Sequence, residues 1–338
     1  MKMNQGHFAS ILSKKTYTTF DGTGSLKNLS GLCIELLSEQ KKAWLDLREG
    51  YASLKNIRER ALSCRGFSVR LQHNPGRIKN SLADVGEIIE NERRCFLCMD
   101  HLPEEQKGIL YRSEYLILCN PRPVFSSHFT ISHSVHRRQA IAEHIDIFLQ
   151  IMSDFGSHFT VLYNGPRCGA SAPDHLHFQA VPSGQMPIER EIHEETKSAL
   201  ISQVDGVLLY RARDLGREVI ILEGGDPMVM GVIFNRFLDA FRKVLHLDEE
   251  PMLNVAGLYG EGRWRLVIFL RRKHRPDLFF AKGDAQVVVS PGAIDMGGVL
   301  ITPIERDFER LDAASVEGIY GEVSLEGETV TQVMEQLK

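Results

Sequence analysis

The sequence lacks a long hydrophobic run, because no uninterrupted apolar stretch exceeds five residues, as at residues 266–270. A membrane-spanning helix needs about 20 such residues. Residues 1–15 also lack the apolar region of a secretory signal and the many arginines of a transit peptide. Surplus positive charge is missing too, since 40 Lys and Arg stand against 44 Asp and Glu, a net charge of −4. These absences exclude a membrane-spanning helix and a bulk binder of nucleic acid or acidic lipid, and they predict a cytosolic protein.

Cysteine is scarce, because the 338 residues include six cysteines, too few and too scattered for a disulfide framework. We therefore expect reduced thiols or a metal site. Histidine is unevenly spread, and nine of the thirteen histidines lie within residues 101–193. The chain length predicts about two domains, and we expect the chemistry in the histidine-rich window.

Periodicity predicts the order of the elements. Residues 29–47 have helical spacing and residues 67–71 alternate like a strand, so residues 1–90 are expected to form a mostly helical N-terminal extension. From Cys95 onward the pattern changes to short strands at residues 115–118, 128–132, 159–163 and 175–181. These strands surround a helix predicted from about residue 136 to residue 155, which has an apolar stripe at three- and four-residue steps.

The same order recurs weakly in residues 206–275. Strands are predicted at 207–210, 219–222, 253–258 and 264–270, and between them a helix starts with Asp226 as N-cap and Pro227 in the first position. We therefore predict an α+β fold with two related halves, residues 91–200 and 201–338. A chance recurrence in a two-domain α+β protein is the alternative.

Four potential ligands of a soft metal occur in the first half. Cys95 and Cys98 form a Cys-x-x-Cys turn, and His136 and His175 follow further along the chain. Two thiolates and two imidazoles form a ligand set that suits tetrahedral zinc. A redox pair or two buried thiols are the alternatives, although the strand and helix order of a thioredoxin-like motif is missing.

Residues 164–179 are the most informative segment. On a strand, His175, His177 and Gln179 would project to one side while Leu176 and Phe178 enter the core. Alternation alone is also typical of histidines on a solvent-facing surface. However, the glycines and Ser171 of the preceding loop offer backbone N–H groups and a hydroxyl to a phosphate at the same place.

These motifs together resemble a known superfamily. The order Cys95-Phe96-Leu97-Cys98, then residues 128–136, then His175-Leu176-His177-Phe178-Gln179 is similar to the histidine triad (HIT) superfamily. The glutamine in place of a third histidine resembles the branch of galactose-1-phosphate uridylyltransferase, diadenosine tetraphosphate (Ap4A) phosphorylase and the GDP-hexose phosphorylases. The resemblance implies a HIT-like fold with an antiparallel sheet and flanking helices.

The resemblance also implies a role for each motif. His177 would be the nucleophile that forms a covalent nucleotidyl-histidine, and Gln179 and Ser171 would stabilise charge on the phosphate. Asn164, Gly169 and Ala170 are similar to the branch's phosphate loop, with spacings one residue away from the uridylyltransferase pattern. The four metal ligands would be Cys95, Cys98, His136 and His175, in a closed structural zinc site. His128 and His133 compete with His136 as the third ligand.

The second half departs from the first at the decisive strand. Its matching segment, Trp264-Arg265-Leu266-Val267-Ile268, has no histidine pair and no metal ligands, so it cannot repeat the chemistry. Lys273 belongs to the basic run 271–276 and is expected to reach the distal phosphates of the substrate. An equally weighted alternative is that this run is only a solvent-exposed strand end. Arg167 and Arg122 are further candidates for substrate contacts.

The function predicted from these residues is transfer of a nucleoside monophosphate through His177. The donor would be a dinucleoside polyphosphate or a nucleoside diphosphate sugar, and the acceptor phosphate or a sugar phosphate. A nucleotide hydrolase and a non-catalytic nucleotide-binding protein are the alternatives. We expect a monomer or homodimer with neither nucleic acid nor membrane as a partner.

Overall fold

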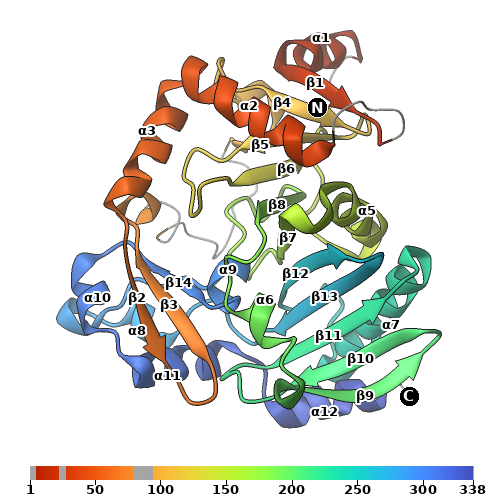
Figure 1. Cartoon of the computed structure of the whole chain (residues 1–338), viewed down its shortest axis with the longest axis vertical. Helices are drawn as coiled ribbons and strands as arrows, with labels where there is room; N and C mark the ends of the chain where they lie inside the picture. Colours follow the sequence, from red (N-terminus) through yellow and green to blue (C-terminus); the bar gives the residue numbers. More distant parts are fainter. Residues whose placement is uncertain (1–4, 23–27, 79–81, 83–93, 338) are drawn as a thin grey trace.

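One large sheet organises the chain. The computed structural model describes residues 5–22, 28–78, 82 and 94–337, and it places eleven strands in this sheet (Figure 1). In spatial order, the strands are β1 (Thr16–Phe20), β4 (Gly108–Tyr111), β5 (Tyr115–Cys119), β6 (Phe129–His133), β8 (His177–Pro182), β7 (Phe159–Asn164), β12 (Leu253–Gly260), β13 (Arg263–Leu270), β11 (Val219–Gly224), β10 (Val207–Ala212) and β9 (Ser198–Val204). Apart from the parallel pair β1 and β4, neighbouring strands are antiparallel.

The sheet consists of two related halves. Outward from the centre, the first half reads β7, β8, β6, β5, β4 and the second reads β12, β13, β11, β10, β9. Helix α5 (Ile145–Phe155) precedes β7, and helix α7 (Pro227–Leu245) precedes β12 at the equivalent point. The halves meet where β7 pairs with β12, and α5 packs against α7. The predicted pair of pseudo-repeated halves and the α+β class are therefore confirmed.

The two faces of the sheet have different covers. Helices α2 (Leu29–Ala43), α5, α7 and α12 (Gly327–Glu335) share one apolar core on the first face. The opposite face of the second half packs against α9 (Ala293–Met296), α10 (Glu305–Arg310) and α11 (Ala313–Val323), together with a small sheet. This small sheet contains β2 (Arg58–Ser63), β3 (Ser68–His73) and β14 (Val299–Thr302). The remaining short helices are α1 (Gln5–Lys15), α3 (Leu45–Ser53), α6 (Ile188–Glu191) and α8 (Asp277–Phe280).

Within the described part of residues 1–90, most of the regular structure is helical, but the segment also adds strands to both sheets and so does not form a separate extension. Helices α1, α2 and α3 account for most of its regular structure, while β1 extends the large sheet and β2 and β3 form the small one with β14. Residues 1–4, 23–27, 79–81 and 83–90 of the predicted extension lie outside the described residues. The sequence pattern did not reveal β1 or β14, because each is short and pairs with a distant strand.

Helix α7 forms as its sequence predicts. The Asp226 carboxylate accepts the N–H groups of Met228 and Val229, and Pro227 takes the first helical position. The predicted helix 136–155, in contrast, begins only at Ile145, after a short 3₁₀ turn. Residues before this turn pair with the rest of the fold instead, since the Arg137 carbonyl accepts the N–H of Leu176. The Glu250 carboxylate accepts the N–H groups of Ile141 and Ala142.

The register of the sheet aligns strands β8 and β13 one residue away from the alignment expected from the sequence. Gln179 pairs with Leu162, Leu162 with Ala256, and Ala256 with Val267. Cross-strand neighbours share a face, so Val267 corresponds to Gln179 and Arg265 to His177. The sequence match had paired Leu266 with His177, although Leu266 faces the helix-covered core.

Candidate active site

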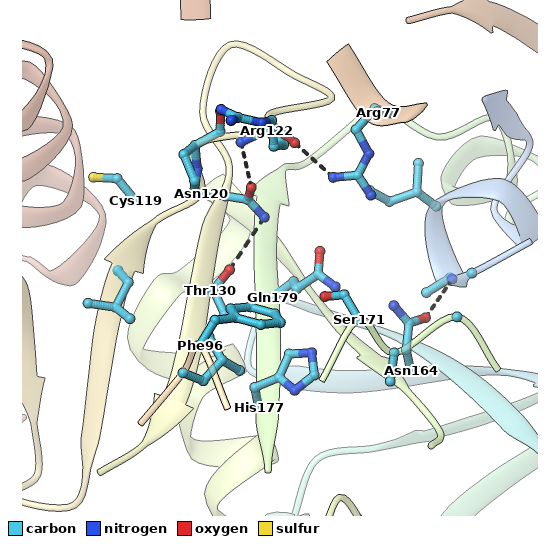
Figure 2. A pocket seen from close by; sticks show the side chains of 18 of the residues that line it. Arg77, Phe96, Cys119, Asn120, Arg122, Thr130, Asn164, Ser171, His177 and Gln179 are labelled. Carbon is cyan, nitrogen blue, oxygen red and sulfur yellow. Dashed lines mark hydrogen bonds between the residues drawn. The ribbon is translucent and has the colours of Figure 1, made fainter. Parts of the chain in front are cut away.

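A cavity of about 390 Å³ opens beside the first half of the sheet (Figure 2). His177 and Gln179 from β8 and the loop that carries Ser171 form its floor. The N-terminal segment contributes Arg77, and the segment after β13 contributes His274 and Ser290. The cavity therefore unites chain segments from all three predicted regions.

His177 is held in one tautomer. It is 2% exposed, and its Nδ1 lies 2.8 Å from the backbone oxygen of His175. A carbonyl oxygen can only accept, so Nδ1 carries the proton and Nε2 keeps its lone pair. Burial lowers the pKa of His177 below its usual value. The ring is therefore neutral at neutral pH, with Nε2 available as a nucleophile or base.

The side-chain amide of Gln179 is also fixed. The fully buried His128 accepts the N–H of Val124 at Nδ1, so its Nε2 carries the proton and donates to Gln179 Oε1 over 2.7 Å. Burial, with the nearby charge of Arg77, lowers the pKa of His128 to about 3. With its oxygen occupied, Gln179 presents its NH₂ group to the cavity. His128 was considered as a metal ligand from sequence, and its contact with Gln179 was not foreseen.

Asn164 ends β7 at the rim of the cavity. Its Oδ1 accepts the N–H of Ala293 over 2.7 Å and the side-chain amide of Asn254 over 2.7 Å. The remaining Nδ2 lies on the side of Ser171 (Figure 2). Asn164 and Gln179 thus both offer amide hydrogens to the space above His177.

The loop after Asn164 is shaped by close backbone packing. Gly169 has φ +89°, and a Cβ atom there would lie 2.9 Å from the Gly292 Cα, so only glycine fits. Ala170 is buried and Ser171 lines the cavity. The structure thus brings together Asn164, Gly169, Ala170, Ser171, His177 and Gln179, all predicted as site residues.

Two predicted substrate contacts are not part of this cavity. Lys273 forms ion pairs with Asp277 and Glu322, and Arg167 is exposed and lies 3.9 Å from Glu249. Both cations are drawn to acidic side chains outside the cavity. The cationic lining comes instead from three arginines. They are Arg77, Arg122 and Arg275.

Arg77 differs from the other cavity arginines in its partners. Arg122 pairs with Asp46 over 3.1 Å, and Arg275 donates to Ser290 and lies over the Phe279 ring. Arg77 donates to the Arg122 carbonyl oxygen and forms no ion pair among the described residues, and the carboxylate whose charge acts on it is the buried Asp295 of the cavity lining. The basic run indicated the correct segment for Arg275, whereas no sequence signal identified Arg77.

The four predicted metal ligands meet outside the cavity. One ligand atom from each of Cys95, Cys98, His136 and His175 lies within 4.8 Å of the others. His175 Nε2 donates to the backbone oxygen of His133 over 2.8 Å, so its Nδ1 lone pair faces the thiols. Burial and the neighbouring Cys95 raise the pKa of the Cys98 thiol to about 12, a cost that a bound cation would offset. The group can therefore hold a metal ion.

The other candidates for the third ligand have different partners. His133 donates from Nδ1 to the Val135 backbone oxygen over 2.8 Å and accepts a guanidinium N–H from Arg137 at Nε2. His128 holds Gln179, as described above. The structure therefore places His136, rather than His128 or His133, beside Cys95, Cys98 and His175.

Comparisons with known proteins identify the fold. Structures of yeast Ap4A phosphorylase in complex with AMP, in complex with Ap4A and without a named ligand give TM-scores of 0.54, 0.56 and 0.52. Each match covers 85% of this chain and 94–97% of the yeast chain, at 13–15% identity. The chain thus has the fold of yeast Ap4A phosphorylase, which confirms the expected resemblance at the level of the fold.

Sequence comparisons add less. The family model for a domain of unknown function, DUF4922, matches residues 36–182, which include the metal-ligand group and both cavity residues of β8. The search of curated proteins gives no match. Among the described helices, none has the length and apolar character needed to cross a membrane.

Proposed function

We propose that this protein is a nucleotidyltransferase of the phosphorylase type that acts through a covalent nucleotidyl-histidine. The observation that carries the proposal is the state of His177, a buried neutral imidazole whose Nδ1–H is held by the His175 carbonyl. Its Nε2 has the lone pair that a nucleophile needs. The locked amides of Gln179 and Asn164 and the hydroxyl of Ser171 line the same cavity.

The reaction would proceed in two displacements. In the first, His177 Nε2 attacks the α-phosphorus of the nucleotide, the P–N bond forms, and the P–O bond to the leaving phosphate or polyphosphate breaks. The Nδ1 proton stays on the ring, where the His175 carbonyl stabilises the positive charge of the adduct. In the second, an oxygen of the acceptor attacks phosphorus and the P–N bond breaks, which restores the neutral imidazole.

Charge on the phosphoryl oxygens grows during both steps. Gln179 and Asn164 can each donate amide hydrogens without reorganising, because their oxygens are already occupied. Preorganised donors of this kind stabilise a transition state more than flexible ones. Arg77 supplies a cation for further phosphates of the donor or for the acceptor.

The substrate class follows from the lining of the cavity. An apolar wall of Phe96, Leu97, Leu102 and Leu118 suits a nucleobase, and the arginines suit phosphates. The yeast enzyme with this fold was solved with AMP and with Ap4A, which supports a nucleotide donor such as a dinucleoside polyphosphate. A nucleoside diphosphate sugar stays the second donor class, and inorganic phosphate is the proposed acceptor.

The metal ion proposed at the Cys/His group is zinc. Two thiolates and two imidazoles suit it, and four protein ligands leave no open position for substrate. The group would therefore stabilise the fold rather than take part in the chemistry. It would act on the site through His175, because the Nδ1 of His175 faces the thiols and would bind the ion while its backbone oxygen accepts the Nδ1–H of His177.

The proposal is tested by trapping the intermediate. The protein is incubated with donors labelled at the α-phosphate, namely Ap4A, ATP, GDP-mannose and UDP-glucose, and protein-bound label is measured after denaturation at alkaline pH. We expect acid-labile label from at least one donor, with release of a labelled nucleoside diphosphate on addition of inorganic phosphate. Release as a monophosphate at the same rate without phosphate would indicate a hydrolase. Nucleotide binding without any label would indicate a non-catalytic protein.

A further inference from the structure

Below the cavity, the second half holds a buried guanidinium that has no carboxylate partner among the described residues. Arg271 is 1% exposed and follows directly after β13. Its hydrogen bonds go to oxygens of neutral groups: the side chain of Asn254 at 2.5 Å and the carbonyls of Pro291, His274, Lys273 and Val323 at 2.8–3.3 Å. Since a guanidinium has only donors, every group that faces it must accept.

This contact fixes the orientation of Asn254. The side chain is fully buried, and its Oδ1 is the atom that accepts from Arg271. Its Nδ2 therefore points the other way, where it donates to Asn164 Oδ1 and to the Cys168 carbonyl, each over 2.7 Å. The bond between Asn254 and Asn164 spans the junction of the two halves, where β7 pairs with β12.

Asn164 receives a second constraint from the C-terminal segment. The N–H of Ala293 donates to the same Oδ1 over 2.7 Å. A backbone N–H cannot accept a hydrogen bond, so this contact favours the same orientation of the Asn164 amide as the contact with Asn254 does. The chain of donors runs in one direction, from Arg271 through Asn254 to Asn164, and it ends with an NH₂ group beside Ser171 (Figure 2).

We infer that Asn254 and Arg271 are positioning residues, through which the second half sets the donor direction of Asn164 for nucleotidyl transfer. This inference rests on the proposed function, because it assigns Asn164 the task of donating to a phosphoryl oxygen. The second half then contributes to catalysis without a reactive group of its own. A purely structural alternative is that Arg271 only ties the segments 271–274 and 290–293 together.

Two substitutions at one position separate these accounts. Asn254→Asp keeps an acceptor for Arg271 and gives the guanidinium a counter-charge, but it places a second oxygen against Asn164 Oδ1. The Asn164 amide would then turn its NH₂ toward the new carboxylate and leave an oxygen in the cavity. Asn254→Ala removes the acceptor of Arg271 and leaves a void, but it places no oxygen against Asn164. If Asn254 sets the orientation of Asn164, Asn254→Asp should slow catalysis more than Asn254→Ala. If Asn254 and Arg271 only support the fold, Asn254→Ala should slow catalysis more.

The experiment is a double-mutant cycle on the full-length protein. Single-turnover labelling by the best donor is measured for wild type, Asn254→Asp, Asn254→Ala, Asn164→Ala and the double variant Asn254→Asp with Asn164→Ala, and thermal unfolding of each variant is the check on folding. We expect Asn254→Asp to slow labelling about 10- to 100-fold, comparable to the loss of one preorganised donor. In the Asn164→Ala background, the same change should alter the rate by less than about twofold, because the residue through which it acts is gone.

Several outcomes would overturn the inference. The first is an Asn254→Asp protein that is labelled as fast as wild type. The second is an equal loss of labelling rate from Asn254→Asp in the wild-type and Asn164→Ala backgrounds. The third is a larger loss of labelling rate in Asn254→Ala than in Asn254→Asp, together with a lower unfolding temperature of Asn254→Ala. If wild type binds AMP but takes no label, the proposed function fails. The same cycle is then measured through the AMP dissociation constant. The orientation account still predicts that Asn254→Asp weakens AMP binding only when Asn164 is present. A wild type that neither takes label nor binds AMP overturns both.

Discussion

The two halves use the same face of one sheet in opposite ways. In the first half, the side chains of His177 and Gln179 line an open cavity. In the second half, Val267 corresponds to Gln179, and Val267 and Phe269 belong to an apolar core that includes Ile319 and Val323 of α11. The backbone pattern is shared, and the difference lies in what covers the face.

Under the proposed function, the second half has no reactive group of its own and still serves the site. The C-terminal segment that packs on the second half also reaches the cavity, where Ala293 holds Asn164 and Ser290 lines the wall. The described part of the second half has no group of possible metal ligands like that of the first. It contributes contacts that hold the Asn164 side chain at the cavity of the first half.

The largest contrast is expected between equivalent positions on β8 and β13. His177→Ala removes the proposed nucleophile and should reduce label incorporation by about 10⁴-fold or more. Arg265→Ala, at the corresponding position of the second half, should stay within about twofold of wild type, because Arg265 pairs with Glu223 outside the cavity. The measurement is single-turnover labelling, and equal losses in both variants would break the proposed division of roles.

The metal-ligand group provides a second contrast. Cys95→Ser should reduce bound zinc from about one ion per chain to near zero and lower the unfolding midpoint by about 5 °C or more. Cys64→Ser is the matched control, since Cys64 is a half-buried thiol away from that group. Elemental analysis and calorimetry measure both effects. A wild-type protein that keeps full activity and the same unfolding midpoint after its zinc is removed, or that contains no zinc as purified and is fully active, would contradict a structural metal site.

The orientation of Gln179 can be tested through His128. His128→Phe preserves the ring but removes the donor to Gln179 Oε1, so the amide can turn and its NH₂ is no longer held toward the cavity. We expect labelling to slow about 10- to 100-fold, with little further loss in a Gln179→Ala background. His144→Phe, a half-buried histidine that contacts Tyr115, is the control. Additive losses would show that His128 supports the fold and not the amide.

The smallest expected effect concerns the cationic lining. Arg77→Ala removes a cavity guanidinium and should raise the KM for phosphate or donor about tenfold, because an anion loses a charge-assisted hydrogen bond. Lys273→Ala removes a cation that is paired with Asp277 and Glu322, and it should leave the KM within about twofold. Steady-state kinetics distinguish the two. The reverse ranking would restore the substrate role predicted for Lys273 from sequence.

Sequence patterns were sufficient for features that depend on local spacing. Alternation placed His177 and Gln179 on one face and Leu176 and Phe178 in the core. His175, expected beside His177 and Gln179, instead precedes β8 and turns its ring to the thiols of Cys95 and Cys98. The Cys-x-x-Cys turn and two later histidines were predicted to form one group, and these four residues lie together in the structure. Helix α7 followed from an N-cap, a proline and an apolar stripe. In these cases, short-range geometry or ligand type restricts the possibilities to a few.

Features set by partners far along the chain were beyond such patterns. The contact between Asn254 and Asn164 joins residues 90 positions apart, and its direction depends on Arg271 and on a backbone N–H. The basic run 271–276 was found, but the choice of Arg275 over Lys273 as a lining residue depends on where Glu322 lies. The late start of α5 has the same origin, because Arg137 and Ile141 bond to other segments.

The central claim is tested most directly by locating the covalent adduct. The protein is quenched during turnover with the best donor, digested at alkaline pH, and examined by mass spectrometry with electron-based fragmentation. We predict one nucleoside monophosphate per chain, attached to His177 and absent after phosphate is added. An adduct on His274 or Ser290, which the second half contributes to the same cavity, would contradict the claim. Donor consumption without any adduct on His177 would contradict it as well.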